Sequence, residues 1–518
     1  MSQNPYVFQP DELPTLPGSP HTPRHDTLRR WGYIPIALIA GIAGTLGNGL
    51  VSVHSALLAG AYGMDTAEAG WLIAANMSTA VCANLLLVRA RQQFGLMRVI
   101  EWLVLAYILA AALHIFVPGF QTALLLRAVC GLSGSALIGL AVYSMLQVVS
   151  PPDRPKGLVI AFGITQLGIP LARLVPTDIL AWDGGSGLSY IELGLGLLVL
   201  CAIHLHPVPP TLHAKAFRKA DFLTMAFFMP AIVLICGVLA NGRAHWWTDT
   251  PWLGWMLVVA LPLLMVAIWL EMHRHEPLIT IKWIKGSDVV RFALIALMVR
   301  VSLAEQTYGA VGLLTVGGLG NDQLHTMFVF VMIAMVCGTA TGAFMLKPGR
   351  MPLAIGISAL LIMTGALMDS HASNLTRPEQ LYLSQSLIGF GAALFLGPSM
   401  ITGFLRMLKH GPEAFITFLV LFGMTQNLGA LFGSALLGSF QTLMAHRYRQ
   451  TLSENLLSTN PLVMQHGDFQ AMLTRESNIL AFNDVFRLVA LIAFIVAVCM
   501  IGSALRHFYQ TRTPKVSP

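Results

Sequence analysis

The sequence contains little charge, few cysteines and none of the short motifs that mark nucleotide-binding or hydrolytic enzymes. Only 11% of its 518 residues are charged, whereas soluble domains carry about a quarter. The six cysteines all lie in apolar stretches, and no two have the CxxC spacing, which argues against disulfides and against a zinc site. We therefore predict a protein without a metal or a cofactor.

Enzyme signatures are also missing. The chain has no GxxxxGKS or GxxxxGKT loop, so it provides no ATP site of its own. The HExxH, GxSxG and protein kinase signatures are absent as well. The sequence is therefore not predicted to encode an enzyme. If it encodes a transporter, an ion gradient is the expected source of energy.

What the sequence has in abundance is long apolar stretches. Hydrophobic residues make up 55% of the chain and the mean hydropathy is +0.69. Each stretch is long enough to cross a hydrocarbon core of about 30 Å as a helix. The sequence therefore predicts an all-α integral membrane protein with 14 transmembrane helices, near residues 33–53, 69–89, 99–117, 120–148, 157–180, 188–204, 221–240, 252–272, 289–318, 325–345, 351–370, 380–407, 414–440 and 485–508.

Lysine and arginine are unevenly distributed between the segments that join these stretches. With the N-terminus inside, 22 of the 31 fall in inner segments, five in outer segments and four within stretches. The positive-inside rule then predicts that both termini are cytoplasmic. The same bias explains the pI near 9.2, so no nucleic-acid partner is predicted.

The spans group into two bundles joined by extra elements. We predict the following organisation: a disordered cytoplasmic tail over 1–30, an N-terminal six-span bundle over 31–206, a linker with two extra spans over 207–284, a C-terminal six-span bundle over 285–508, and a cytoplasmic tail over 509–518.

The C-terminal bundle contains a long outer loop over 441–484. Apolar residues at helical spacing predict a helix over 440–457. This helix is interpreted either as a plain surface helix or as a docking site for another protein.

Three arginines, Arg127, Arg173 and Arg300, lie inside apolar stretches. A charge in hydrocarbon is costly, so such a side chain usually faces the protein interior or a water-filled path. Gly131 and Gly134 follow Arg127 and allow a neighbouring helix to approach closely. Arg127 is therefore either a structural residue that locks helices together or part of a proton-coupling site.

The fifth stretch contains Arg173 about halfway along and Asp178 toward its outer end. Five residues separate them, which is awkward for a direct pair on one helix. Each side chain is therefore expected to meet another partner. We interpret Arg173 either as an anion-binding group or as a structural bridge, and we include Asp178 among the proton-coupling candidates.

The ninth stretch is the most polar, and it contains Arg300 and Glu305. We identify Glu305 as the only carboxylate near the middle of a span. Burial favours the neutral form of a carboxyl group, whereas a neighbouring arginine favours the ionised form, and a proton-switching group needs this balance. The alternative is a static Arg300–Glu305 pair, which would be strained within one helix.

The candidate sites are therefore of two kinds. The proton-coupling candidates are Glu305, Arg300, Arg127 and Asp178. The substrate-binding candidates are Arg173, Arg300, Gln166, Tyr308, Asn48 and Gln426.

Several short motifs follow one another in a characteristic order. Arg127 with Gly131 matches a span-4 motif, and residues 88–98 keep the Gly95 and Arg98 of a motif between spans 2 and 3. Over residues 33–508 the chain resembles the major facilitator superfamily, and most closely its 14-span drug:proton antiporter branch, the EmrB/QacA type. Further matches are Asp221, Gly237, Gly242, Arg243, Trp252, Glu271, Glu276 to Ile279, Gly389 to Pro398 and Ala481 to Phe486.

The resemblance implies export of a small organic molecule, driven by the proton gradient and working by alternating access. It implies a multidrug efflux antiporter of the bacterial inner membrane, in contact with membrane lipid. It also implies a periplasmic membrane-fusion adaptor that binds through the loop 441–484. An uncoupled membrane binding or sensing protein and an uptake permease of the same fold are the alternatives.

One departure from the family concerns coupling. The family places an aspartate in span 1 about where Gly47 stands, and that aspartate pairs with the span-4 arginine. Because it is absent here, we hypothesise that Glu305, with Arg300, has taken the coupling role. Three buried arginines and few buried acids further favour an anionic or zwitterionic substrate, because the charge of a cavity complements that of its ligand.

Overall fold

The computed structural model describes residues 12, 18–212, 214–274, 277–278, 287–347, 350–408, 412–459 and 468–512. Thirteen helices in this part of the chain are long and apolar enough to cross a membrane. The rest of both predicted tails, the motif residues Glu276 and Ile279, and residues 460–467 of the predicted outer loop lie outside it.

The chain divides into two compact units. The first comprises Met1–Ala172, Thr177–Val289 and Gly403–Met424. Its helices are α1 (Thr27–Val53), α2 (Ser55–Tyr62), α3 (Thr66–Phe94), α4 (Leu96–Phe116), α5 (Phe120–Val148), η1 (Pro151–Asp153), α6 (Arg154–Gln166), α7 (Gly168–Arg173), α8 (Thr177–Gly185), α9 (Gly187–Leu205), α10 (Lys219–Asn241) and α11 (Pro251–Met272).

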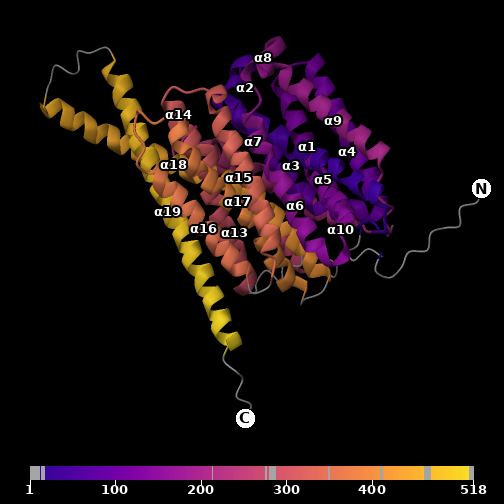
Figure 1. Cartoon of the computed structure of the whole chain (residues 1–518). Helices are drawn as coiled ribbons and strands as arrows, with labels where there is room; N and C mark the ends of the chain where they lie inside the picture. The colour runs from indigo at the N-terminus through magenta and orange to yellow at the C-terminus, as the bar shows by residue number, and fades with distance from the viewer. Residues whose placement is uncertain are drawn as a thin grey trace, which may run out of the picture. The chain divides into compact units, whose positions relative to one another are not determined.

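Helix α5 is the centre of the first unit and packs against α1, α3, α4 and α6 (Figure 1). Two glycines make the closest contacts. A Cβ on Gly131 would lie 2.2 Å from the carbonyl oxygen of Asn76 in α3, and a Cβ on Gly134 would lie 2.6 Å from that of Gly44 in α1. The predicted role of these two glycines in close helix approach is confirmed, and it brings the residues of α5 within reach of α3 and α1.

Local signals set the ends of α3. Its N-terminus has a capping box, in which Asp65 accepts a hydrogen bond from the backbone N–H of Glu68 and Glu68 accepts one from that of Asp65. Its C-terminus is Gly95, whose φ of +86° is reached at low cost only by glycine. The glycine of the predicted loop motif therefore makes the turn into α4.

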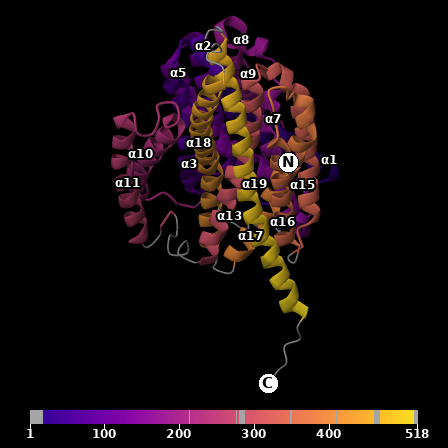
Figure 2. The same cartoon turned by 90° about the vertical axis from the view of Figure 1, so that its left-hand side faces the viewer.

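The two extra helices, α10 and α11, lie side by side (Figure 2) and α10 also packs on α3. One ionic cluster joins their ends. Arg274 binds Asp221, which is fully buried, and donates a hydrogen bond of 2.7 Å to Glu271. The Thr224 hydroxyl donates a second hydrogen bond of 2.7 Å to Glu271. Most of α11 is exposed, with 17% of its apolar window buried.

Residues 18–26, predicted to belong to a disordered tail, are hydrogen-bonded to the rest of the first unit. Pro20 forms an isolated β-bridge with Thr211, so the segment lies beside the linker that follows α9. Gln147 of α5 donates a hydrogen bond of 3.0 Å to the backbone oxygen of His21. The prediction of disorder is wrong for this segment.

The predicted fifth span also differs from expectation. The helix stops at Arg173, the last residue of α7, and a new short helix, α8, begins at Thr177 after Pro176. Arg173 therefore lies at a helix end and not halfway along a span. Asp178 lies in the first turn of α8 and is exposed, so its placement within a span is wrong.

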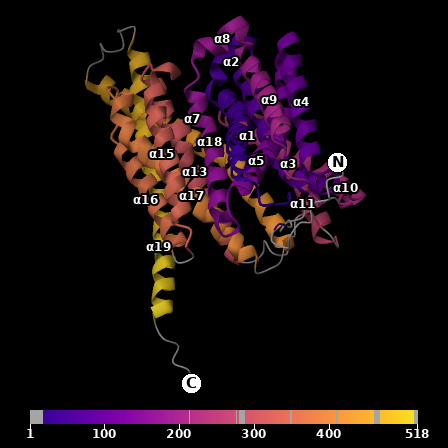
Figure 3. The same cartoon turned by 45° about the vertical axis from the view of Figure 1, so that its right-hand side comes forward.

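The second unit comprises Arg173–Pro176, Val290–Thr402 and Thr425–Pro518. Alanine, valine and isoleucine side chains from α13, α16 and α19 form its core, with Phe395 and Leu437. Helices α16 and α19 pack against each other (Figure 3). The helices that lie wholly or partly in this unit are α13 (Ser287–Ala304), η2 (Glu305–Ala310), α14 (Val311–Val316), η3 (Asn321–Leu324), α15 (His325–Phe344), α16 (Met351–Asp369), α17 (Pro378–Leu408), α18 (Pro412–Thr459) and α19 (Phe469–Arg512).

The last two helices correct the predicted outer loop 441–484. Helix α18 has 48 residues and α19 has 44, so they are about 72 Å and 66 Å long and extend well beyond a hydrocarbon core of about 30 Å. The helix predicted over 440–457 is confirmed, but it continues α18 and is not a separate surface element. Most of the predicted loop is a helical hairpin.

We expect the Arg274 cluster to stabilise the α10–α11 pair. The substitution Arg274→Gln leaves two buried carboxylates without their cation, and breaking a buried pair costs about 3–5 kcal/mol of unfolding free energy. Thermal unfolding of the purified protein should therefore start at a lower temperature. Lys156→Gln is the matched control, because Lys156 and Asp153 form an exposed pair that contributes little. Equal unfolding temperatures for the two variants would contradict this assignment.

Candidate functional site

The predicted ninth span is broken in the middle. Helix α13 ends at Ala304, and the next six residues form the π-helical segment η2 before α14 continues. Such wide turns are rare and frequently occur at functional sites. A Cβ on Gly309 would lie 2.9 Å from the ring of Phe486, and one on Gly312 would lie 2.6 Å from the ring of Phe482. The two glycines thus let η2 and α14 pack directly on α19.

Glu305, the first residue of η2, shares one amide group with a second carboxylate. Nε2 of Gln385 in α17 donates a hydrogen bond of 3.0 Å to Oε1 of Glu305 and another of 2.7 Å to Oδ2 of Asp369, at the end of α16. Glu305 and Gln385 are fully buried and Asp369 is 1% exposed. We name these three residues the acid pair site.

The acid pair site contains two carboxyl groups and one neutral bridge. Neither Glu305 nor Asp369 forms an ion pair with a Lys, Arg or His among the described residues. Oε2 of Glu305 and Oδ1 of Asp369 accept no hydrogen bond there either. Buried charges normally require a partner. Proton uptake neutralises the carboxyl groups without one, so the site is suited to binding and releasing protons.

Arg300 does not pair with Glu305. Its Nε donates a hydrogen bond of 3.1 Å to the backbone oxygen of Gln426 in α18. Its aliphatic stem lies on Gly429, where a Cβ would be 3.0 Å from Cγ of Arg300, and Gly433 makes a similar approach to Val301. In the part of the chain that the structure describes, Arg300 has no carboxylate partner.

Arg173 is held by neutral groups as well. It donates a hydrogen bond of 3.2 Å to the side-chain oxygen of Asn321, which returns one of 2.9 Å to the Arg173 backbone oxygen. Its guanidinium lies 5.6 Å from the ring centre of Phe328, close enough for a cation–π interaction. No carboxylate among the described residues pairs with it.

The other predicted substrate-binding residues are dispersed. The Tyr308 hydroxyl donates a hydrogen bond of 3.3 Å to Gln441, and Gln426 uses its backbone to hold Arg300. Asn48 in α1 and Gln166 at the end of α6 are half-buried in the first unit. Tyr308 and Gln426 belong to the second unit, and Asn48 and Gln166 belong to the first.

Arg127, in the first unit, pairs with an acidic residue that the sequence analysis did not identify. It forms an ion pair with Glu192 of α9 and donates a hydrogen bond of 3.1 Å to the backbone oxygen of Gly47 in α1. Arg127 is 2% exposed and Glu192 is fully buried. Glu192 therefore provides the acid that the family resemblance leads one to expect at Gly47.

Three important residues were therefore missed: Glu192, Asp369 and Gln385. Glu192 and Asp369 lie near the ends of predicted spans, where a carboxylate is easily taken for an interfacial group. A single acid inside an apolar stretch was nevertheless a usable signal, and both acids fell within the stretches drawn from sequence.

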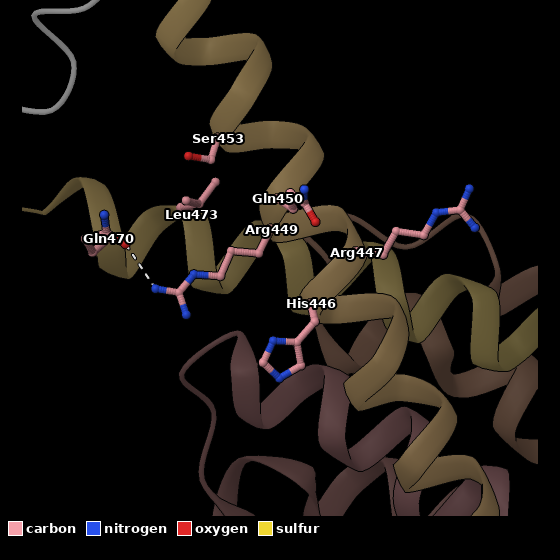
Figure 4. Close-up of a pocket in the computed structure, with 7 residues that line it drawn as sticks. All are labelled: His446, Arg447, Arg449, Gln450, Ser453, Gln470 and Leu473. Atoms are coloured by element: carbon pink, nitrogen blue, oxygen red, sulfur yellow. Dashed lines mark hydrogen bonds between the residues drawn. The ribbon is translucent and has the colours of Figure 1, made fainter.

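The helical hairpin of α18 and α19 has a surface pocket of different character (Figure 4). It is lined by His446, Arg447, Arg449, Gln450, Ser453, Gln470 and Leu473. Arg449 donates a hydrogen bond of 3.1 Å to Gln470 across the hairpin. The Arg447 side chain points to the opposite side, away from Gln470 (Figure 4). The exposed basic lining suits contact with another molecule better than transport through a membrane.

Comparison with known proteins defines the family. A model of the Major Facilitator Superfamily matches residues 36–440. The chain belongs to the major facilitator superfamily. Members of this superfamily are membrane transporters, and the described helices make this chain a multi-pass membrane protein. The predicted all-α major facilitator fold is confirmed. The described residues contain thirteen candidate spans, and the broken ninth span is not among them.

The similar sequences are distant. An MFS-type transporter, dmxR4, of Cryptosporiopsis sp. (strain 8999) is 25% identical to this chain over the aligned residues. The alignment covers 64% of this chain and 57% of that relative's length. Multidrug resistance protein 3 of Bacillus subtilis is 21% identical over 84% of this chain and 77% of its own.

Solved structures share the fold. A bacterial homologue of the human drug peptide transporters PepT1 and PepT2 has a TM-score of 0.57 and 10% identity over 93% of this chain and 99% of its own. The human organic anion transporter MFSD10 has a TM-score of 0.51 and 14% identity over 90% of this chain and 99% of its own.

Proposed function

We propose that the protein exports a small organic molecule by exchanging it for protons across a bacterial inner membrane. The observation that carries this proposal is the acid pair site, in which Gln385 bridges the buried carboxyl groups of Glu305 and Asp369. Proton binding changes the charge of this site by a full unit in a region where charge is costly. That change gives the proton gradient a means of acting on the conformation.

The coupling role predicted for Glu305 is kept, but its partner changes. Arg300 binds a backbone oxygen instead of Glu305, so Asp369 and Gln385 replace it in the proposal. Asp178 is withdrawn because it is exposed. In alternating access the site would take up protons from one side and release them to the other.

We propose an anionic or zwitterionic substrate. Arg300 and Arg173 have no carboxylate partner among the described residues, so an organic anion would complement either charge. Arg127 no longer supports this argument because Glu192 neutralises it. The organic anion transporter named above shares only the fold, so the substrate class rests on the arginines.

We place the protein in the 14-span drug:proton antiporter branch, with α10 and α11 as the extra pair. The exposed apolar side chains of α11, among them Trp255, Leu261, Met265 and Trp269, suit direct contact with lipid. The distribution of lysine and arginine supports cytoplasmic termini.

The uptake permease is kept as the second candidate, since the acid pair site serves either direction. An uncoupled sensing protein is less favoured, because its main support was the missing acid at Gly47. The buried carboxyl groups of Glu192, Glu305 and Asp369 are candidate proton sites without it. The direction in which substrate accumulates separates export from uptake.

We propose that the hairpin of α18 and α19 docks a periplasmic membrane-fusion adaptor. The hairpin is held by its own contacts, including a hydrogen bond of 2.7 Å from the Tyr448 hydroxyl to Asp484. Exposed basic side chains at its end, such as Arg447 and Arg449, suit an acidic surface on the partner.

The acid pair site yields the first functional prediction. Glu305→Gln and Asp369→Asn each keep the size of the side chain and remove a titrating group. In proteoliposomes with an internal pH dye, we expect each to reduce substrate-dependent proton movement by about 100-fold, a typical loss for an acid–base group. Glu379→Gln is the control, because Glu379 is an exposed acid on the same helix as Gln385. Full coupling in both acid-pair variants would refute the proposal.

The substrate class is tested by competition. A panel of aromatic carboxylates and lipophilic cations, including benzoate and tetraphenylphosphonium, is screened for thermal stabilisation and inhibition of transport. We expect the carboxylates to act, and Arg300→Gln to weaken their binding by about tenfold, since a lost charged hydrogen bond costs about 1.5–3 kcal/mol. Arg487→Gln is the control, because Arg487 is exposed and paired with Asp484. Inhibition by the cations alone would exclude an anionic substrate.

The adaptor is tested by deleting residues 445–480. We expect cells with two membranes to lose export, because passage of the substrate to the adaptor needs the hairpin. The same variant should still transport in proteoliposomes, where no adaptor is present. Unchanged export by these cells would rule out adaptor docking at this hairpin. Loss in both assays would show that the hairpin is needed for transport itself.

A further inference from the structure

The first unit contains a buried acid that the proposed coupling at Glu305 does not use. Glu192 of α9 is fully buried and forms an ion pair with Arg127 of α5. The two residues are on different helices, so the pair forms and breaks only through contacts between helices. Ion pairs inside membranes are rare and often mark proton or ion pathways.

The side chains around this ion pair explain why residue 47 of α1 is a glycine. A Cβ built on Gly47 would lie 2.8 Å from Oε1 of Glu192, 3.0 Å from Sγ of Cys130 and 3.3 Å from the hydroxyl of Tyr107. The Glu192 carboxylate therefore occupies the space that a side chain at Gly47 would fill. Arg127 reaches the same place, because it donates a hydrogen bond to the Gly47 backbone oxygen.

We propose that Glu192 is a second proton-carrying group, and that it acts on Arg127 from α9 in the position that a side chain on α1 would otherwise hold. A proton from one aqueous side binds the Glu192 carboxylate, forms its O–H bond and neutralises the partner of Arg127. Release of that proton to the other side restores the ion pair. This inference rests on the proposed proton-driven transport.

The titratable groups around the carboxylate are few and come from three helices. Arg127 and Cys130 come from α5, Tyr107 from α4 and Tyr62 from α2. Arg127 is the only cation among these four. Protonation of Glu192 therefore removes the negative charge that faces Arg127, while the hydrogen bond from Arg127 to the Gly47 backbone oxygen stays. The pair therefore has two charge states within one unit: an ion pair when Glu192 is ionised, and a lone arginine charge when Glu192 is protonated.

A structural lock is the competing explanation, and the isosteric variant separates the two. Glu192→Gln imitates the protonated acid. We expect it to lose gradient-driven accumulation by about tenfold or more, the size of a typical coupling between two ligands, while exchange of labelled for unlabelled substrate without a gradient stays within about twofold. The probe is the aromatic carboxylate that most stabilises the wild-type protein. Glu101→Gln is the control, a half-buried glutamate of α4 in the same unit.

A relocation variant makes the test independent of the stability of Glu192→Gln. Gly47→Asp together with Glu192→Ala moves the carboxylate from α9 to α1 and removes the Glu192 oxygen that would lie 2.8 Å from a Cβ on Gly47. We expect this double variant to regain proton coupling, whereas Glu192→Ala alone does not. A folded double variant without coupling would overturn the proposal, as would full gradient-driven accumulation in Glu192→Gln.

The result is also separable from the proposed function. If the wild-type protein moves no protons with the probe, the proposed function fails first. If the wild-type protein and Glu101→Gln are coupled and Glu192→Gln is equally coupled, only the role of Glu192 fails. Equal loss of exchange and accumulation in Glu192→Gln would identify the pair as a structural lock and overturn the proposal.

Discussion

The neutralisation of buried charge is the constraint on which both units depend. A helix can bury apolar side chains freely in a membrane protein, but an ionised group needs an opposite charge or several hydrogen bonds. In the first unit Arg127 and Glu192 offset each other's charge. In the second unit Glu305 and Asp369 share only the Gln385 amide. The first arrangement is neutral as an ion pair, whereas the second becomes neutral only when protons bind.

The charged groups can meet because small residues allow helices to approach. Helix association in membranes relies on close van der Waals packing, and glycine permits the shortest distances. Gly131 and Gly134 bring α5 against α3 and α1, and Gly309 brings η2 against α19. The same residues would cost stability in an isolated helix, because glycine loses more backbone entropy than alanine. Their positions therefore follow the charged residues that the packing brings together.

The sequence predicted the fold well because hydrophobic length and charge bias are strong local signals. It also identified Arg127, with the glycines that position it, and Glu305. It failed on partners: Arg300 and Glu305 are neighbours in sequence, yet they bind different helices. Glu192 and Asp369 lie in other spans, and only packing brings them to Arg127 and Glu305. The break in the ninth span was missed because the π-helical segment has no proline, and its one glycine, Gly309, lies near its end.

Gly47 shows why a motif is better defined in space than along the chain. Judged by its position in α1, the glycine looks like the loss of an acid and hence of proton coupling. The structure places the Glu192 carboxylate 2.8 Å from where its Cβ would be, beside the same arginine. An ion pair depends on the separation and surroundings of two charges, and not on which helix carries them. An acid that moves to a facing helix can therefore preserve the electrostatics of a site while its sequence signature disappears.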